Sequence, residues 1–248
     1  MKKALWAFAF LYTVILGTAS AKAQKILFLT EENPPFNYTS AEGISGLATD
    51  ILFRMTEIAQ VPLTRDDIQI LPWARAYQKL QDEPNAILFC MARTPEREKH
   101  FQWIGPIVHI KSSLIAPKNK KIVIRDLVAD TRHYSIGTVR KSASDHALTA
   151  HGVPNQNIQR LHDIQLNVQK LLSGRIDLIA IPELAFSHHI KKLGADPDLF
   201  ESVYPLMDNA FSFGVNPSMD PATVNKLQKA LDHLTISGEL DRIIARYR

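Results

Sequence analysis

The sequence predicts an α/β fold with a mainly parallel β-sheet. Short apolar runs bounded by turn residues alternate with segments whose apolar residues recur at helical spacing. This alternation is typical of βαβ units, in which a helix connects two parallel strands. The chain contains no internal repeat and no low-complexity tract. Its length suits one large domain or two small ones, with enough apolar residues for hydrophobic cores.

The first part of this alternation predicts three strands and two helices. We expect strands at residues 25–30, 68–71 and 86–91, and helices after Gly46 and after Pro72. The apolar faces of these helices contain Leu47, Ile51, Met55 and Ile58 in the first and Trp73, Tyr77 and Leu80 in the second.

A second unit begins after residues 114–117 and predicts three further strands, at residues 134–139, 176–181 and 210–215. Four helices accompany them, each marked by a capping residue or a proline at its start. They are expected to begin at Asp163, after Pro182, at Asp220 and at Gly238, and the first of them is expected to end at Gly174.

The N-terminal segment is typical of a secretory signal peptide over residues 1–23. Two lysines precede an apolar run at residues 4–16, and small residues are spaced for cleavage after Ala21 or Ala23. The apolar run is far shorter than the roughly 20 residues needed to span a bilayer. Because the sole cysteine is Cys90, we expect neither a lipid anchor nor an internal disulfide. The sequence therefore predicts a periplasmic protein that is not embedded in a membrane.

Charge and histidine spacing argue against two classes of function. The formal net charge of +4 falls to about +1 without the three lysines of the leader. A nucleic-acid-binding protein needs a clustered basic face, whereas the basic cluster at residues 118–121 is typical of a solvated surface. The nine histidines, including the adjacent His188 and His189, show no spacing known for metal ligands. We expect no nucleic-acid partner, no metal and no cofactor.

Residues 90–106 contain the most informative motif, because they place Arg97 just after an apolar strand. A guanidinium is planar and permanently charged, which suits bidentate binding of a carboxylate. Loops that follow parallel strands lie at the carboxyl edge of a sheet, where α/β folds bind ligands. Asn33, Trp73 and Arg97 all fall in such loops. The sequence therefore indicates a ligand site at this edge.

Five motifs together resemble solute-binding family 3, the periplasmic proteins that bind polar amino acids. They are residues 34–36, Gly46 with Asp50, residues 94–97, residues 174–177 and the closing helix from Gly238, in the family's order and spacing over essentially the whole mature chain.

The resemblance implies the type II periplasmic binding-protein fold, with two α/β lobes joined by a two-strand hinge. Lobe 1 would comprise residues 25–113 plus 210–248, and lobe 2 would comprise residues 114–209. The hinge strands would cross near Leu114 and Phe211. In this family the ligand lies between the lobes, and hinge closure buries it.

The same resemblance assigns a carboxylate-binding role to Arg97, aided by backbone groups around Cys90 and Ala92. Ser142 falls where the family has a small hydroxyl residue at a helix start. Its hydroxyl and the helix N-terminus would meet the same carboxylate, or the hydroxyl would only cap the helix.

Four positions of the expected site concern the shape and polarity of the pocket. Trp73 falls where some family members offer an aromatic wall, although a tryptophan at a helix start also suits a core. Arg75 would provide a second cation or point outward. Ala92 replaces a serine or threonine of the family pattern, and Asn33 replaces an aromatic platform.

Pro182 is the main departure, because amino-acid binders of the family usually carry there the aspartate that pairs with the α-ammonium group. A buried ammonium without a counter-charge would cost several kcal/mol. Either Glu183, Glu31 or Glu32 compensates, or the ligand lacks that amine.

We therefore expect a monomeric solute-binding protein that captures a small carboxylate-bearing ligand, an amino acid or a similar molecule, for an ABC importer. Two alternatives stay open. An exported enzyme on the same fold, similar to cyclohexadienyl or arogenate dehydratases, would need a catalytic acid or base such as Glu183 or Asp145. A soluble sensor would present its closed form to a membrane receptor.

Overall fold

The structure, a computed structural model, describes residues 25–247, so the expected signal peptide at residues 1–23 lies outside the described residues. The strands are β1 (Leu27–Thr30), β2 (Tyr38–Ser40), β3 (Gly43–Ser45), β4 (Ile68–Ile70), β5 (Ala86–Ala92), β6 (Gln102–Pro117), β7 (Ile136–Val139), β8 (Ile158–Leu161), β9 (Leu178–Pro182) and β10 (Phe200–Val215). The α-helices are α1 (Leu47–Ile58), α2 (Trp73–Asp82), α3 (Pro95–Glu98), α4 (Leu127–Thr131), α5 (Ala143–Ala150), α6 (Ile164–Leu172), α7 (Glu183–Lys192), α8 (Pro221–Ile236) and α9 (Glu239–Ala245). Short 3-10 helices are η1 (Arg65–Asp67), η2 (Lys118–Lys120), η3 (Asn155–Asn157) and η4 (Pro197–Leu199).

Eight strands form one sheet in the order β4-β1-β5-β10-β6-β9-β7-β8, and β2 and β3 form a separate hairpin. β1 pairs in parallel with β4 and β5, and β7 pairs in parallel with β8 and β9. At the centre, β10 is antiparallel to β5 and β6, and β6 is antiparallel to β9. The predicted α/β fold is confirmed, because the sheet is mostly parallel outside its two central strands.

Local sequence signals explain where the predicted elements begin and end. The carboxylate of Asp163 accepts a hydrogen bond of 2.8 Å from the backbone N–H of Leu166 and so caps α6. Gly174 follows this helix at φ 68°, a left-handed conformation that glycine adopts without strain. The carboxylate of Asp220 caps α8 in the same way as Asp163 caps α6. All seven residues of β5 are buried, as their continuous apolar run predicts.

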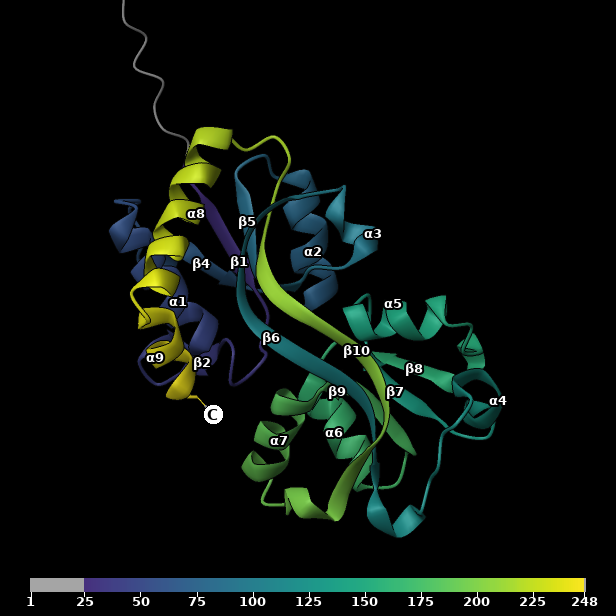
Figure 1. Ribbon diagram of the computed structural model, residues 1–248. Helices are drawn as coiled ribbons and strands as arrows, with labels where there is room; N and C mark the ends of the chain where they lie inside the picture. The colour runs from purple at the N-terminus through teal and green to yellow at the C-terminus, as the bar shows by residue number, and fades with distance from the viewer. Residues whose placement is uncertain (1–24, 248) are drawn as a thin grey trace, which may run out of the picture.

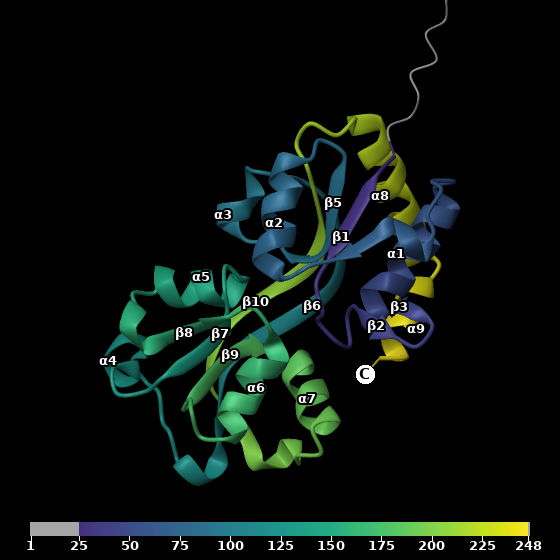
Figure 2. The same ribbon diagram turned by 180° about the vertical axis from the view of Figure 1, so that it is seen from behind.

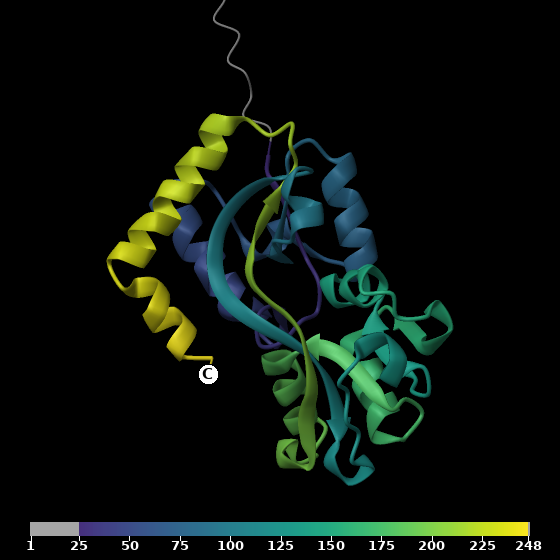
Figure 3. The same cartoon turned by 45° about the vertical axis from the view of Figure 1, so that its right-hand side comes forward.

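Two halves of the molecule share the sheet (Figures 1 and 2). The upper half of Figure 1 contains β1 to β5, with α1, α8 and α9 on one side of the sheet and α2 and α3 on the other. The lower half contains β7, β8 and β9 with α4 to α7. The long strands β6 and β10 run through both halves (Figure 3). We use the terms upper half and lower half for these two groups of elements.

Strand pairing locates the passage between the halves. β5 of the upper half pairs with residues 211–215 of β10, and β9 of the lower half pairs with residues 112–115 of β6. The two strands therefore pass from one half to the other at residues 109–111 of β6 and 208–210 of β10, which are paired with one another. We call this place the crossing. Leu114, expected near the crossing, instead pairs with Tyr204 and Ala180 inside the lower half. The division into lobes with boundaries at these residues stays a prediction.

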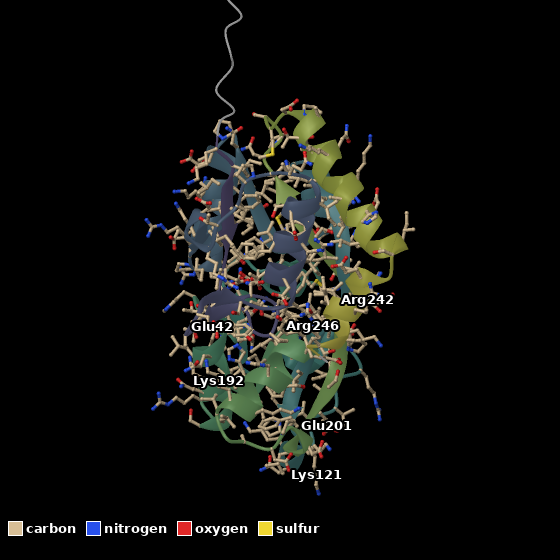
Figure 4. The ribbon with its side chains drawn as sticks, turned by 90° about the vertical axis from the view of Figure 1, so that its left-hand side faces the viewer. Glu42, Lys121, Lys192, Glu201, Arg242 and Arg246 are labelled. Atoms are coloured by element: carbon tan, nitrogen blue, oxygen red, sulfur yellow. The ribbon has the colours of Figure 1, made fainter. Side chains whose placement is uncertain are left out.

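Each half contains buried apolar side chains. In the upper half, Phe28, Leu88 and Phe213 lie on neighbouring strands and are fully buried. In the lower half, Ile136 and Leu178 form part of a second buried cluster. Figure 4 shows Glu42 of the β2–β3 turn and Lys192 of α7 on the two sides of the boundary between the halves. Within residues 25–247, no helix combines the length and apolar character required to cross a membrane.

Candidate ligand-binding site

A cavity lies between the two halves, at the carboxyl ends of β1, β5, β7 and β9. Its empty volume is about 570 Å³ including open solvent at the mouth. The centre of a water molecule can reach only about 50 Å³ of this space, so the cavity is narrow. Both halves and the two crossing strands line it. The lining residues are Glu31, Asn33, Trp73, Cys90, Ala92, Arg97, Ile110, Ser112, Thr138, Val139, Ser142, Ala143, Ser144, Ile164, Asn167, Ile179, Ala180, Ile181, Pro182, Met207 and Phe211.

Arg97 provides a buried cation on the upper side of this cavity. It belongs to the short helix α3, which Pro95 opens directly after the loop that follows β5. Its Nη1 donates to the backbone carbonyl of Ala92 at 3.1 Å. Its guanidinium carbon lies 5.2 Å from the ring centroids of both Trp73 and Tyr77, so the group packs against two aromatic rings. Burial lowers the pKa of Arg97 from its ordinary value, but an arginine side chain stays charged in proteins.

The carbonyl of Lys141, in the lower half, accepts two hydrogen bonds from the upper half. Trp73 Nε1 donates to it at 2.7 Å, and Arg97 Nη2 donates at 3.3 Å. The loop that presents this carbonyl is held by Asp145, which accepts from the Lys141 N–H at 2.8 Å. Ser142 caps α5, because its hydroxyl accepts from the N–H of Asp145 at 3.2 Å. The two halves are therefore joined across the cavity by side-chain donors and one backbone acceptor.

Among the described residues that line the cavity, Glu31 is the one with a carboxyl side chain. It follows β1, and its backbone carbonyl accepts a hydrogen bond of 2.5 Å from Nδ2 of Asn37, which holds the loop. Burial raises the pKa of its carboxyl to about 8; Arg97 acts in the opposite direction, and Asp163 raises the pKa further. The group is therefore mainly uncharged at pH 7.

The cavity between the two α/β halves agrees with the result of a family comparison. Residues 26–248 match the family model described as bacterial extracellular solute-binding proteins, family 3. The chain belongs to this solute-binding family. The expected family membership and the solute-binding role are thereby confirmed.

Known proteins of similar sequence or fold include binding proteins and a sensor. A probable histidine-binding protein of Neisseria gonorrhoeae is 22% identical over 219 residues, which cover 87% of this chain and 80% of that protein. A substrate-binding protein of an ABC uptake transporter from Streptococcus pneumoniae, with bound histidine, has a TM-score of 0.77 at 16% identity and covers 90% of this chain and 92% of its own. A histidine kinase sensor domain has a TM-score of 0.78 at 13% identity, with 90% and 96% covered. The two structural likenesses show the shared fold.

In this member of the family, six of the eight predicted ligand residues line the cavity. They are Asn33, Trp73, Cys90, Ala92, Arg97 and Ser142. Arg75 is exposed on α2 and lies outside the lining. Glu183 also lies outside it, because its Oε1 accepts a hydrogen bond of 2.6 Å from the hydroxyl of Ser113. Successive residues of a strand point to opposite faces, so the Glu183 site lies on the face of β6 opposite to Ser112, which lines the cavity.

Sequence reasoning missed several polar residues of the lining, among them Asn167 of the lower half and Ser112 of β6. Asn167 occupies the buried face of α6 together with Ile164, Val168 and Leu171. An asparagine at a core position of a helical pattern is a signal that was available in the sequence. Ser112 offers a weaker signal, because serines are common at the ends of apolar runs.

Proposed function

We propose that this protein captures a small carboxylate-bearing solute in the cavity between its halves and delivers it to an ABC importer. The buried guanidinium of Arg97 carries this proposal, because it is held by Ala92, Trp73 and Tyr77 and retains donors for a ligand. A buried cation without a partner anion is costly, and a carboxylate would satisfy both its charge and its planar geometry.

Closure of the upper half against the lower half would complete the site. The hydrogen bonds from Trp73 and Arg97 to the carbonyl of Lys141 join the halves directly over the cavity. At a second place along the boundary, the rings of Tyr38 and His188 approach to 6.1 Å between centroids. Opening at the crossing of β6 and β10 would break these contacts and admit a ligand. A transporter can then recognise the closed form as the loaded form.

The proposal includes secretion to the periplasm, with removal of residues 1–23, and action as a monomer. Binding without catalysis is favoured by two of the named relatives, which are binding proteins. A dehydratase would release a product from prephenate or arogenate, whereas a binding protein would leave both unchanged. A sensor role would require a receptor in place of a permease, and pull-down of the ligand-loaded protein from membranes would distinguish these partners.

Thermal unfolding against a panel of amino acids and other small carboxylates tests the proposal. Ligand at 100 times its Kd stabilises a protein by about 2.7 kcal/mol. For a chain of this size the shift in Tm is about 5 to 11 °C. Arg97→Ala should abolish the shift, whereas Arg132→Ala, which removes an exposed arginine outside the cavity, should retain it. An unchanged shift in Arg97→Ala would contradict carboxylate capture by this residue.

A further inference from the structure

Three oxygen atoms of cavity-lining side chains have no hydrogen-bond partner within the described part of the chain. They are Asn33 Oδ1, Ser112 Oγ and Asn167 Oδ1, and their residues are only 3%, 1% and 1% exposed. The amide nitrogen of Asn167 donates to the carbonyls of Thr138 and Asp163, both at 3.1 Å, so the orientation of its Oδ1 is fixed. Buried acceptors in native proteins are normally satisfied, and unpaired ones at a cavity call for donors from a ligand.

The acids of the lower half that lie near the cavity are already engaged in structure. Asp145 pairs with Arg160 at 2.7 Å and accepts from the loop backbone. Asp163 caps α6, and Glu183 is bound to Ser113 on the opposite face of β6. At the end of β9, Pro182 is paired with Ser112, so this part of the lining offers an uncharged hydroxyl. The side chains of the lower half that line the cavity are therefore uncharged, and the acids lie behind them.

The two charged or ionisable side chains that dominate the cavity come from the upper half. Arg97 is a permanent cation. Glu31 faces Arg97 of α3, Asp163 at the start of α6 and Cys90 of β5, and burial keeps its carboxyl mainly protonated at neutral pH. The side chains that line the cavity consequently carry a net positive charge near pH 7, which matches a ligand with a net charge of −1 better than a zwitterion.

Building on the proposed function, we infer that the ligand is a carboxylate whose second polar group is an uncharged hydrogen-bond donor, such as the hydroxyl of a 2-hydroxy acid, and not an α-ammonium group. Arg97 binds the carboxylate, and the hydroxyl donates to one of the unpaired oxygens, of which Ser112 Oγ belongs to the residue paired with Pro182 at the end of β9. An ammonium group in the same place would need a counter-charge, which Glu31 supplies only by losing its proton.

Isothermal titration calorimetry with matched ligand pairs tests this inference. The pairs are L-phenylalanine with L-3-phenyllactate and L-leucine with L-2-hydroxy-4-methylpentanoate. At about pH 6, where Glu31 is protonated, we expect the hydroxy acid of a pair to bind at least about tenfold more tightly. At about pH 8.5 the ionised Glu31 should lower the affinity for the hydroxy acid and raise the affinity for the amino acid, so the ratio of the two Kd values should come closer to one.

Two sets of variants separate charge from shape. Pro182→Asp should shift the preference toward the amino acid by about tenfold, whereas Pro182→Asn, of similar shape and without charge, should not. Ser112→Ala should lower the affinity for the hydroxy acid about fivefold to tenfold. Ser113→Ala, on the opposite face of the same strand, should leave the affinity for the hydroxy acid unchanged.

The outcomes distinguish this inference from the function on which it rests. Tighter or equal binding of the amino acid at pH 6, with dependence on Arg97, would overturn the inference and leave carboxylate capture intact. Failure of every carboxylate in the panel, with no effect of Arg97→Ala, would overturn both.

Discussion

Replacement of Trp73 by phenylalanine removes one hydrogen bond between the halves and leaves an aromatic ring beside Arg97. The lost bond is the 2.7 Å contact from Nε1 to the carbonyl of Lys141. A neutral hydrogen bond contributes about 0.5–1.5 kcal/mol net, and Arg97 still donates to the same carbonyl. We therefore expect the closed form to lose about 1 kcal/mol relative to the open form, a factor of about 5 in their ratio.

Two measurements would detect this change. Calorimetry with the ligand that stabilises the protein most should give a Kd raised by up to about fivefold, because ligand binding selects the closed form and Kd scales inversely with the closed fraction. Small-angle X-ray scattering of the ligand-free variant should give a larger radius of gyration than that of the unmodified protein. The matched control is Trp103→Phe, which removes a similar bond, from Nε1 to the carbonyl of Glu98 at 3.3 Å, within the upper half alone.

The reasoning would be refuted if Trp73→Phe bound the ligand as tightly as the unmodified protein. Equal losses of affinity in the two tryptophan variants would also refute it, because Trp103 makes its bond without reaching the lower half.

Three further predictions concern stability. Gly137→Ala should lower the free energy of unfolding by about 1–3 kcal/mol, measured by urea denaturation. The reason is that a Cβ at this position would lie 2.5 Å from Ile176 Cδ1 and 2.8 Å from Asn167 Oδ1. Unchanged stability would mean that these two side chains move aside without cost. Burial lowers the pKa of His189 to about 4, so the folded state resists protonation and the free energy of unfolding falls as the pH drops from about 6.5 to 4. His189→Phe should reduce this loss of stability, measured by thermal unfolding at pH 5 and pH 7. An undiminished loss in the variant would contradict the assignment to His189. The raised pKa of Glu31 has the opposite consequence, since the free energy of unfolding decreases from about pH 4.5 to 8, where Glu31 ionises in the unfolded chain but not in the folded protein. Glu31→Gln should remove this decrease from a plot of stability against pH. A decrease that persists in the variant would show that another group causes it.

Much of the fold could be predicted because several elements carry strong local signals. β5 is a continuous apolar run, and α6 has both an aspartate cap and a terminal glycine. The full lengths of β6 and β10 could not be predicted, because exposed and polar residues such as Lys111 and Asp208 interrupt their apolar patterns where the strands pass between the halves. Alternation weakens wherever a strand has no continuous packing face.

The candidate site was partly predictable for a similar reason. Arg97 and Trp73 lie in α3 and at the start of α2, soon after strands that end at the carboxyl edge, and topology alone brings these two segments together. The partners of these residues were not predictable, because the carbonyl of Lys141 is a backbone group and carries no sequence signal. The opposite orientations of Ser112 and Glu183 depend on the register of β6 with β9, which pairing in space determines.

The chain's path through the sheet has a consequence for the order in which the protein folds. The lower half is built from a continuous stretch of chain, whereas the sheet of the upper half pairs β5 with the end of β10, more than 100 residues later. Closing so long a loop is slow compared with local pairing. We expect the lower half to form first, and the surface that contains Arg97 to be completed only when the final strand and helices have packed.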